Sequence, residues 1–206
     1  MNERKSDDEE LLQRMQDGDE EAFVKLYRRW QAPIFRFAFQ MSGSRTAAED
    51  VTQEVFMALI RNSRGYCASR GSFGAWLYGI ARHIMPRAIS REKTPAVSLN
   101  ETAREAQIEK CCQPGGDPHD EAVRRQRTER LRKTVLTLPV HYREVLVLCE
   151  LHEMNYADAA TSLGCSIGTV RSRLHRARSM LAERLRSAGF ETARPLGTTA
   201  PDGCAV

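Results

Sequence analysis

The sequence predicts an all-α protein with two small helical domains joined by a flexible linker, the C-terminal domain being a helix-turn-helix. Apolar residues recur at intervals of three and four through almost every patterned stretch. No stretch of four or more residues alternates cleanly between apolar and polar between turn signals, which argues against strands. Proline and glycine interrupt the helical pattern in the middle of the chain. These signals divide the 206 residues into an acidic segment at 1–19, a helical domain at 20–94, a linker at 95–121, a helix-turn-helix domain at 122–188 and a disordered tail at 189–206.

The first predicted helix runs from about Glu20 to Gln40. Pro33 lies inside it and is expected to kink or divide it, because proline removes one helical hydrogen bond. Its apolar residues fall at helical spacing and form one broad stripe: Phe23, Leu26, Tyr27, Trp30, Ile34, Phe37 and Met41.

Three further helices are expected in the first domain. Thr46 and Glu49 have the spacing of a capping box, which predicts a helix to about Asn62. Ser72 is placed to cap a third helix. Pro86 suits the first turn of a fourth, short helix.

The second domain contains a helix-turn-helix spacing. Helices are expected at about 121–138, 141–151, 156–163 and 167–188. Ala160, Gly164 and Val170 are spaced so that a small residue lets two helices approach, glycine takes the turn and valine packs the second helix back. Ser166 can cap that second helix.

The last helix has two unlike sides. Val170, Leu174 and Ala177 belong to an apolar stripe, and the opposite half is basic and hydroxylated. Such a helix can enter the major groove, where arginine contacts guanine edges and hydroxyls hold phosphates. A solvated face is the alternative, but Glu183 is the only acid between 169 and 188. We expect Arg173 to lie nearer the middle of the exposed face than Arg171.

Charge and cysteine content narrow the class of protein. The net charge is −6 over 1–21, +8 over 22–94 and −4 over 95–121, so two basic blocks flank an acidic strip. The acidic N-terminus lacks the apolar core of a signal peptide, and no run is long enough to span a membrane. Six cysteines without a CxxC pair argue against a disulfide scaffold or zinc ribbon. We expect a cytoplasmic protein without metal or cofactor and with no direct membrane insertion.

Two surfaces of the first domain have more than one interpretation. Polar residues follow one face of the 46–62 helix at Asp50, Gln53 and Glu54, which solvation alone would explain. The segment 73–83 mixes aromatic and basic residues, as single-strand binding requires. Burial of Trp76 in a helical core is the alternative there.

The order of motifs along residues 10–188 resembles bacterial RNA polymerase sigma factors of the extracytoplasmic-function (ECF) type. Two unrelated blocks carry the resemblance, one in each domain, at the expected separation. They are Phe23-x2-Leu26-Tyr27, Ala48-Glu49-Asp50-x2-Gln53-Glu54-Val55-Phe56, Phe73-x2-Trp76-Leu77-x2-Ile80-Ala81-Arg82, Leu138-Pro139 and the run from Tyr156 to Arg178. The resemblance implies that 20–94 is sigma region 2 and 122–188 is sigma region 4.

The resemblance also implies partners and roles. The partners are core RNA polymerase, through its β′ clamp and β flap, promoter DNA, and an anti-sigma factor that holds the protein inactive until a stress signal. The positions for the clamp are Asp50, Gln53, Glu54 and Phe56; those for the −10 element are Trp76, Arg82 and His83; those for the −35 element are Ser166, Thr169, Arg171, Ser172, Arg173 and Arg176. His83 stands where the family commonly has asparagine, so the resemblance does not predict which base sequence is preferred at the −10 element.

Promoter geometry constrains the linker. Elements about 16–18 base pairs apart are separated by roughly 55–60 Å of duplex, whereas a free coil of the linker's length averages only about 30 Å. Polymerase must therefore hold the linker extended. Free in solution, the two domains can collapse together or be clamped by an inhibitor.

Two other functions, a stand-alone regulator and an enzyme, explain the sequence less well. A stand-alone helix-turn-helix regulator would account for the second domain but lacks the N-terminal block. An enzyme finds no support, because P-loop, GxGxxG, HExxH and GxSxG motifs are absent. Cys111 and Cys112, near His119, could form a redox or metal sensor, but incidental linker residues are the simpler interpretation.

Overall fold

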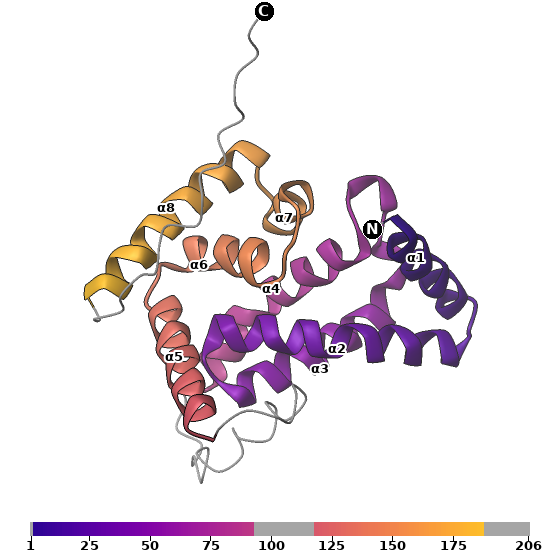
Figure 1. Cartoon of the computed structure of the whole chain (residues 1–206). Coiled ribbons are helices and arrows are strands. Elements are labelled where there is room, and N and C mark those ends of the chain that lie inside the picture. The colour runs from indigo at the N-terminus through magenta and orange to yellow at the C-terminus, as the bar shows by residue number, and fades with distance from the viewer. Residues whose placement is uncertain (1, 93–117, 188–206) are drawn as a thin grey trace, which may run out of the picture.

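The computed structural model describes residues 2–92 and 118–187, and within these ranges the regular structure is entirely helical (Figure 1). Residues 95–117 of the predicted linker, which include Cys111 and Cys112, and the predicted tail at 189–206 lie outside the described residues. The first domain contains α1 (Asn2–Gln16), α2 (Glu20–Ser42), α3 (Arg45–Asn62), the short turns η1 (Ser63–Gly65) and η2 (Ala68–Arg70), and α4 (Phe73–Glu92). The second contains α5 (Pro118–Leu136), α6 (Val140–Leu146), the π-helical turn η5 (Val147–Leu151), α7 (Tyr156–Leu163) and α8 (Ile167–Ser187). The all-α prediction is confirmed.

The two prolines interrupt neither helix, so the prediction of a separate fourth helix at Pro86 was wrong. Helix α2 is not divided at Pro33, and α4 continues through Pro86 instead of restarting there. Each proline forfeits one backbone hydrogen bond, at a cost of about 3 kcal/mol. Packing offsets that cost, because Ile34 beside Pro33 and Met85 beside Pro86 are buried. Tertiary burial therefore overrides a local stop signal.

The caps of the first domain are partly as expected. The Oγ of Ser72 accepts a hydrogen bond from the Ala75 amide (3.2 Å), as predicted for the start of α4. Helix α3 instead starts after Ser44, whose Oγ accepts from the Ala47 amide (3.2 Å). Ser44 is extended and Thr46 is already helical, so the capping-box prediction was two residues late.

Helix α1 was not predicted, because its acidic composition hides a narrow apolar side. Leu11 and Leu12 are buried against the first domain. Asp8 is also buried, and its carboxylate accepts hydrogen bonds from Arg29 (2.5 Å) and the Trp30 indole (3.2 Å). Burial raises the pKa of Asp8, against the opposing effect of Arg29.

The helix-turn-helix is formed by α7 and α8 as predicted. Asn155 caps α7, accepting from the Asp158 amide (2.9 Å). Gly164 follows α7 in the left-handed conformation (φ 63°), which favours glycine. The Oγ of Ser166 accepts from the Thr169 amide (3.1 Å) and caps α8.

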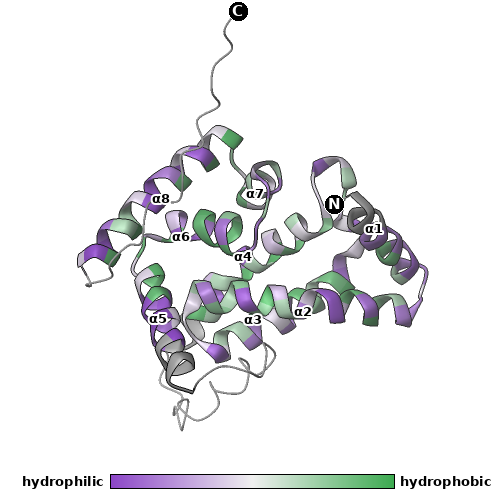
Figure 2. Cartoon of the chain, in the orientation of Figure 1, coloured by the Kyte–Doolittle hydropathy of each residue, from purple (hydrophilic) through white to green (hydrophobic). Residues whose placement is uncertain are grey.

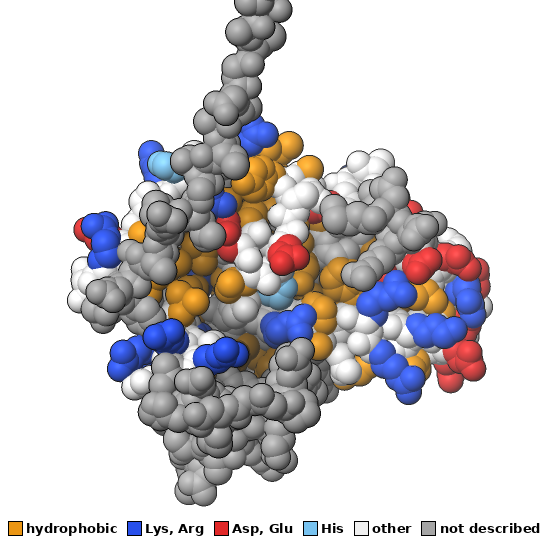
Figure 3. All heavy atoms as spheres, in the orientation of Figure 1, with side chains coloured by type: hydrophobic (Ala, Val, Ile, Leu, Met, Phe, Trp, Pro, Cys, Tyr) orange, Lys and Arg blue, Asp and Glu red, His pale blue; other side chains and the backbone are white. Residues whose placement is uncertain are grey.

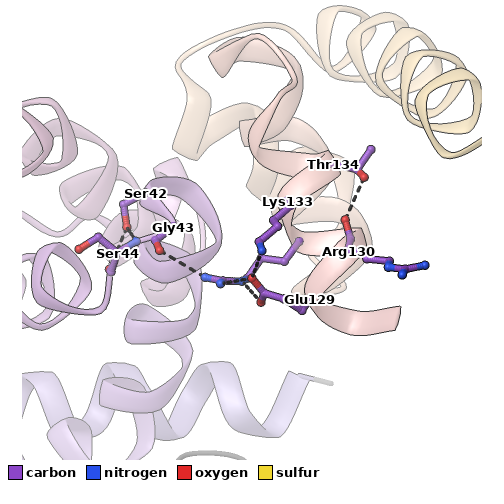
Figure 4. Close-up of polar contacts among 8 residues, drawn as sticks. Ser42, Gly43, Ser44, Glu129, Arg130, Lys133 and Thr134 are labelled. Atoms are coloured by element: carbon purple, nitrogen blue, oxygen red, sulfur yellow. Dashed lines mark hydrogen bonds and ion pairs between the residues drawn. The ribbon is translucent and has the colours of Figure 1, made fainter. Parts of the chain in front are cut away.

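The two domains pack against each other in this structure. Helix α7 packs on α4 and α5 packs on α2, and buried residues of both domains form one continuous hydrophobic cluster. At the α5 contact, the Arg132 guanidinium donates to the Gly43 carbonyl (3.3 Å) and pairs with Glu129 (2.8 Å); Gly43 and Glu129 are labelled in Figure 4. The same guanidinium lies over the Phe39 ring. Helix α1 lies at the far end of α2 from α5 (Figure 1).

Candidate nucleic-acid interface

Helix α8 carries the predicted DNA-binding face. Val170, Leu174 and Ala177 are buried beneath it. The ribbon alternates between hydrophobic and hydrophilic residues along its length (Figure 2), and basic side chains gather over α8 and α5 in the view of Figure 3. The predicted residues on the outer side are exposed, apart from half-buried Thr169 and Arg173: Ser166, Thr169, Arg171, Ser172, Arg173 and Arg176.

Hydroxyl groups organise the first turns of α8. The Ser166 and Thr169 hydroxyls are 2.9 Å apart and hydrogen-bonded, and the Ser172 hydroxyl donates to the Thr169 carbonyl (3.1 Å). A helix N-terminus with exposed hydroxyls favours a phosphate, since its free amides and dipole carry positive partial charge. The start of α8 can thus bind the DNA backbone.

The three arginines differ in exposure. Arg171 and Arg176 are exposed, and Arg173 is half-buried. This reverses the expected order of Arg171 and Arg173. Arg173 comes three residues after Val170 and four before Ala177, and both of those residues are fully buried. The guanidinium of Arg171 lies over the Tyr156 ring of α7 (5.9 Å to the centroid), which orients it.

The predicted −10 residues meet at a cavity of about 320 Å³ between the two domains. Trp76, Arg82 and His83 of α4 all line it, together with the η1–η2 segment. Trp76 is half-buried and His83 is exposed. The cavity therefore combines the aromatic face of Trp76, the cation of Arg82 and the imidazole of His83, which in its neutral form has one donor and one acceptor. Thr161 and Ser162 of α7, and Gly164 directly after α7, form another wall of the cavity.

Side chains of the second domain hold this wall in place. Glu144 of α6 pairs with Arg82 (2.8 Å), and their side chains are 9% and 33% exposed. Asp158 accepts from the Ser72 amide (3.1 Å), and the Ser162 hydroxyl donates to the Ala75 carbonyl (2.7 Å). The sequence analysis missed Glu144, Asp158 and Ser162, because no local pattern marks a contact across more than sixty residues.

His152 forms a second interdomain contact. Its Nδ1 is 2.8 Å from the Tyr78 hydroxyl and its Nε2 is 3.0 Å from Gln40 Oε1. A neutral ring satisfies both bonds, with Tyr78 donating to Nδ1 and the Nε2 proton donated to Gln40. Burial, aided by the charge of Arg36, lowers the pKa of His152 to about 4.

The predicted clamp-binding residues lie on α3, away from the cavity. Asp50 and Gln53 are exposed and Glu54 is half-buried. Met57 and Ile60 continue this face and are 42% and 53% exposed. Phe56 is only 3% exposed and packs under Tyr27 (centroids 4.7 Å apart), so it supports the surface from below.

The remaining chemistry of the described residues is sparse. Within 2–92 and 118–187, no three His, Cys, Asp or Glu side chains are grouped to hold a metal ion. Cys67 is exposed at the cavity, and its hydrogen bond with Ser69 lowers the pKa of its thiol. Burial raises the pKa of Cys149 to about 11. No helix in the described ranges is long and apolar enough to cross a membrane.

Family models match both domains. Residues 26–94 match sigma-70 region 2, and residues 128–181 match sigma-70 region 4. The two matches coincide with the helices that carry the cavity and the helix-turn-helix.

Curated relatives match across both domains. The ECF RNA polymerase sigma factor SigC of Mycobacterium tuberculosis is 34% identical over 161 residues, covering 78% of this chain and 80% of SigC. The ECF RNA polymerase sigma factor SigE of Mycolicibacterium smegmatis is 30% identical over 173 residues. That match covers 82% of this chain but only 64% of SigE.

Solved structures match the same helices. CnrH in complex with the cytosolic domain of CnrY is similar with a TM-score of 0.66 and 25% identity, covering 88% of this chain and 98% of CnrH. The sigma factor RpoE of Bartonella quintana, solved with the anti-sigma factor NepR, has a TM-score of 0.54 and 23% identity. That match covers 80% of this chain and 96% of RpoE.

Proposed function

We propose that this chain, which belongs to the extracytoplasmic-function (ECF) family of RNA polymerase sigma factors, binds core RNA polymerase in the cytoplasm and directs it to promoters. It acts as a non-catalytic initiation factor that recognises a −35 and a −10 element and promotes melting of the DNA. The observation that carries this proposal is that each domain presents groups suited to DNA: arginines and hydroxyls on α8, and Trp76, Arg82 and His83 at the cavity on α4.

The −35 element binds α8. Its buried side holds the helix against α6, and its exposed side presents arginines and hydroxyls that suit base edges and phosphates in a major groove. Ser166, Thr169, Ser172 and the helix N-terminus contact the backbone. Arg171, Arg173 and Arg176 divide between bases and phosphates.

The −10 element binds the cavity on α4. Trp76 offers a face on which an unpaired base can stack, and Arg82 can neutralise a phosphate. His83 presents one donor and one acceptor in its neutral form, so it selects a different base pattern from an amide. Binding single-stranded DNA here stabilises the melted promoter.

The closed arrangement must open for both elements to be bound. Gly164, two residues before the α8 cap, lines the same cavity as Trp76 and His83. Promoter elements are about 55–60 Å apart along the duplex. The 25 residues between α4 and α5 can span at most roughly 85 Å, which permits that separation. The structure therefore corresponds to the unbound protein.

The exposed face of α3 binds the polymerase clamp, and region 4 binds the β flap. Asp50 and Gln53 supply polar contacts, and Met57 and Ile60 supply apolar area that water disfavours. An exposed mixture of this kind, on a well-packed helix, is typical of a protein interface.

An anti-sigma factor holds the protein inactive. The CnrH and RpoE structures described above each contain a second protein, and NepR is an anti-sigma factor. The closed arrangement of the two domains gives such an inhibitor a single compact target.

Run-off transcription with purified core polymerase on a library of random promoters tests the proposed function. We expect transcripts only when both proteins are present, with two enriched sequence elements at one spacing. Tight specific DNA binding by the chain alone, unchanged by core polymerase, would instead identify a stand-alone helix-turn-helix regulator.

A further inference from the structure

Tyr66 connects the N-terminal helix to the cavity. It lies between η1 and η2 and lines the cavity beside Trp76. Its ring centroid is 5.7 Å from that of Trp76 and 5.8 Å from that of Phe73. Its hydroxyl donates to Glu9 Oε1 of α1 (2.8 Å) and is 3.2 Å from the Gly71 carbonyl, which precedes α4.

Helix α1 is itself fixed to the same aromatic group. Asp8, the neighbour of Glu9, accepts from the Trp30 indole, and the Trp30 ring is 6.0 Å from Phe73. Adjacent carboxylates of α1 thus hold two aromatic residues, Trp30, which contacts Phe73, and Tyr66, which lines the cavity. Neither contact was marked by a sequence motif.

We propose that Glu9 is a positioning residue for the −10 element, acting through the Tyr66 hydroxyl on the Trp76 ring and on the 63–72 segment. The acidic N-terminal helix then belongs to the −10 recognition unit. This inference rests on the proposed function of the cavity.

The physical reason is the orientation of one ring. The backbone on either side of Tyr66 has little regular structure, because η1 and η2 are single turns of three residues. A hydrogen bond to a charged carboxylate is stronger than one between neutral groups and fixes the phenol in place. Without it the Tyr66 ring can turn, and the shape that Trp76 presents to a base changes. Burial and Glu9 both raise the pKa of Tyr66, so the hydroxyl keeps its proton.

The test compares Glu9→Leu, Glu9→Gln and Tyr66→Phe with the matched control Glu10→Leu. Glu10 is exposed on the same helix, and its substitution changes the charge equally. Each full-length variant is bound to core polymerase. Its affinity is then measured for single-stranded oligonucleotides carrying the selected −10 sequence and every single-base change of it. Thermal unfolding of each free variant is recorded in parallel.

We expect Glu9→Leu and Tyr66→Phe to lower the discrimination between the preferred base and the others by roughly three- to tenfold at one position, the equivalent of one hydrogen bond. Glu9→Gln retains an acceptor and should keep most of the discrimination, and Glu10→Leu should keep all of it. A uniform loss of affinity with unchanged discrimination, or no change, would overturn the positioning role. If the wild-type holoenzyme shows no base preference at all, the proposed function of the cavity fails instead.

Discussion

At the scale of single residues, the arrangement of charge on α8 determines what each arginine can do. Arg171 is exposed and oriented by the Tyr156 ring near the start of the helix. Arg176 is exposed more than one turn further along, and Arg173 stands beside the buried stripe. Base edges are reached from the first turns of a recognition helix. We therefore expect Arg171 to contact a base and Arg176 to contact a phosphate.

Arg171→Ala should relax the preference at one −35 position, at a cost of about 1–3 kcal/mol. Arg176→Ala should weaken binding about equally on all sequences and reduce the salt dependence by roughly one unit. Holoenzyme affinities for single-base variants of the −35 element at two salt concentrations separate these effects. An equal loss of affinity for every −35 variant with Arg171→Ala would show that Arg171 contacts the DNA backbone and not a base.

At the scale of one element, α3 has a buried side and a side available to a partner. Val51, Val55 and Leu59 are fully buried, whereas Met57 and Ile60 are exposed on the same helix. Met57 and Ile60, which are 42% and 53% exposed beside Asp50 and Gln53, contribute less to the core than the fully buried residues. Changes on that side should consequently affect binding and leave stability nearly unchanged.

Asp50→Lys combined with Met57→Asp should lower the affinity for core polymerase by roughly tenfold or more, because charges of the wrong sign and a buried carboxylate oppose docking. Glu10→Lys, at an exposed position of α1, is the matched control. Pull-down and titration with core polymerase measure the effect, and circular dichroism confirms the helical content. Normal binding of the double variant to core polymerase would show that the exposed face of α3 is not the polymerase-binding surface.

At the scale of the whole molecule, some side chains that join the two domains in the closed arrangement are also side chains that the proposed function needs for binding DNA. Arg82 cannot pair with Glu144 and neutralise a phosphate of the −10 strand at the same time. In the function proposed above, opening therefore exchanges the Glu144 carboxylate for a DNA phosphate as the partner of Arg82. Separation also exposes the histidine contact and the surface between α7 and α4.

Glu144→Gln should shift the free protein toward the open arrangement, because it removes the charge that holds Arg82. Glu150→Gln is the matched control, since Glu150 pairs with Arg178 inside the second domain. Small-angle X-ray scattering at pH 7 should give a larger radius of gyration for Glu144→Gln alone. The same radius for both variants would show that the ion pair does not hold the domains together.

Acid should open the protein through His152. Its pKa is about 4 in the closed arrangement and about 6.5 when solvated. The depressed pKa means that the neutral ring stabilises closure fully above about pH 6.5 and progressively less as the pH falls toward 4. The radius of gyration should rise over that window in the wild type. His152→Phe, which cannot be protonated, should lack this contribution, and an identical pH profile would contradict it.

The sequence by itself determined the helical class and the helix-turn-helix. These follow from local rules: apolar spacing for the helices, glycine at the left-handed turn at Gly164, and a serine cap before α8. The family resemblance grouped Trp76, Arg82 and His83, and all three lie on α4 beside one cavity, whereas their role at the −10 element stays a prediction. Local rules also produced the errors at Pro86 and Thr46, where packing or a better cap prevailed.

Only the tertiary structure decided the rest. The Glu144–Arg82 pair, the burial of His152, the support of Tyr66 by Glu9 and the docking of α1 all join residues far apart in the chain. Hydrophobic periodicity marks which side of a helix is buried but not which helix covers it. A contact across the fold depends on how the whole core packs, and no residue pattern in the sequence records that pairing.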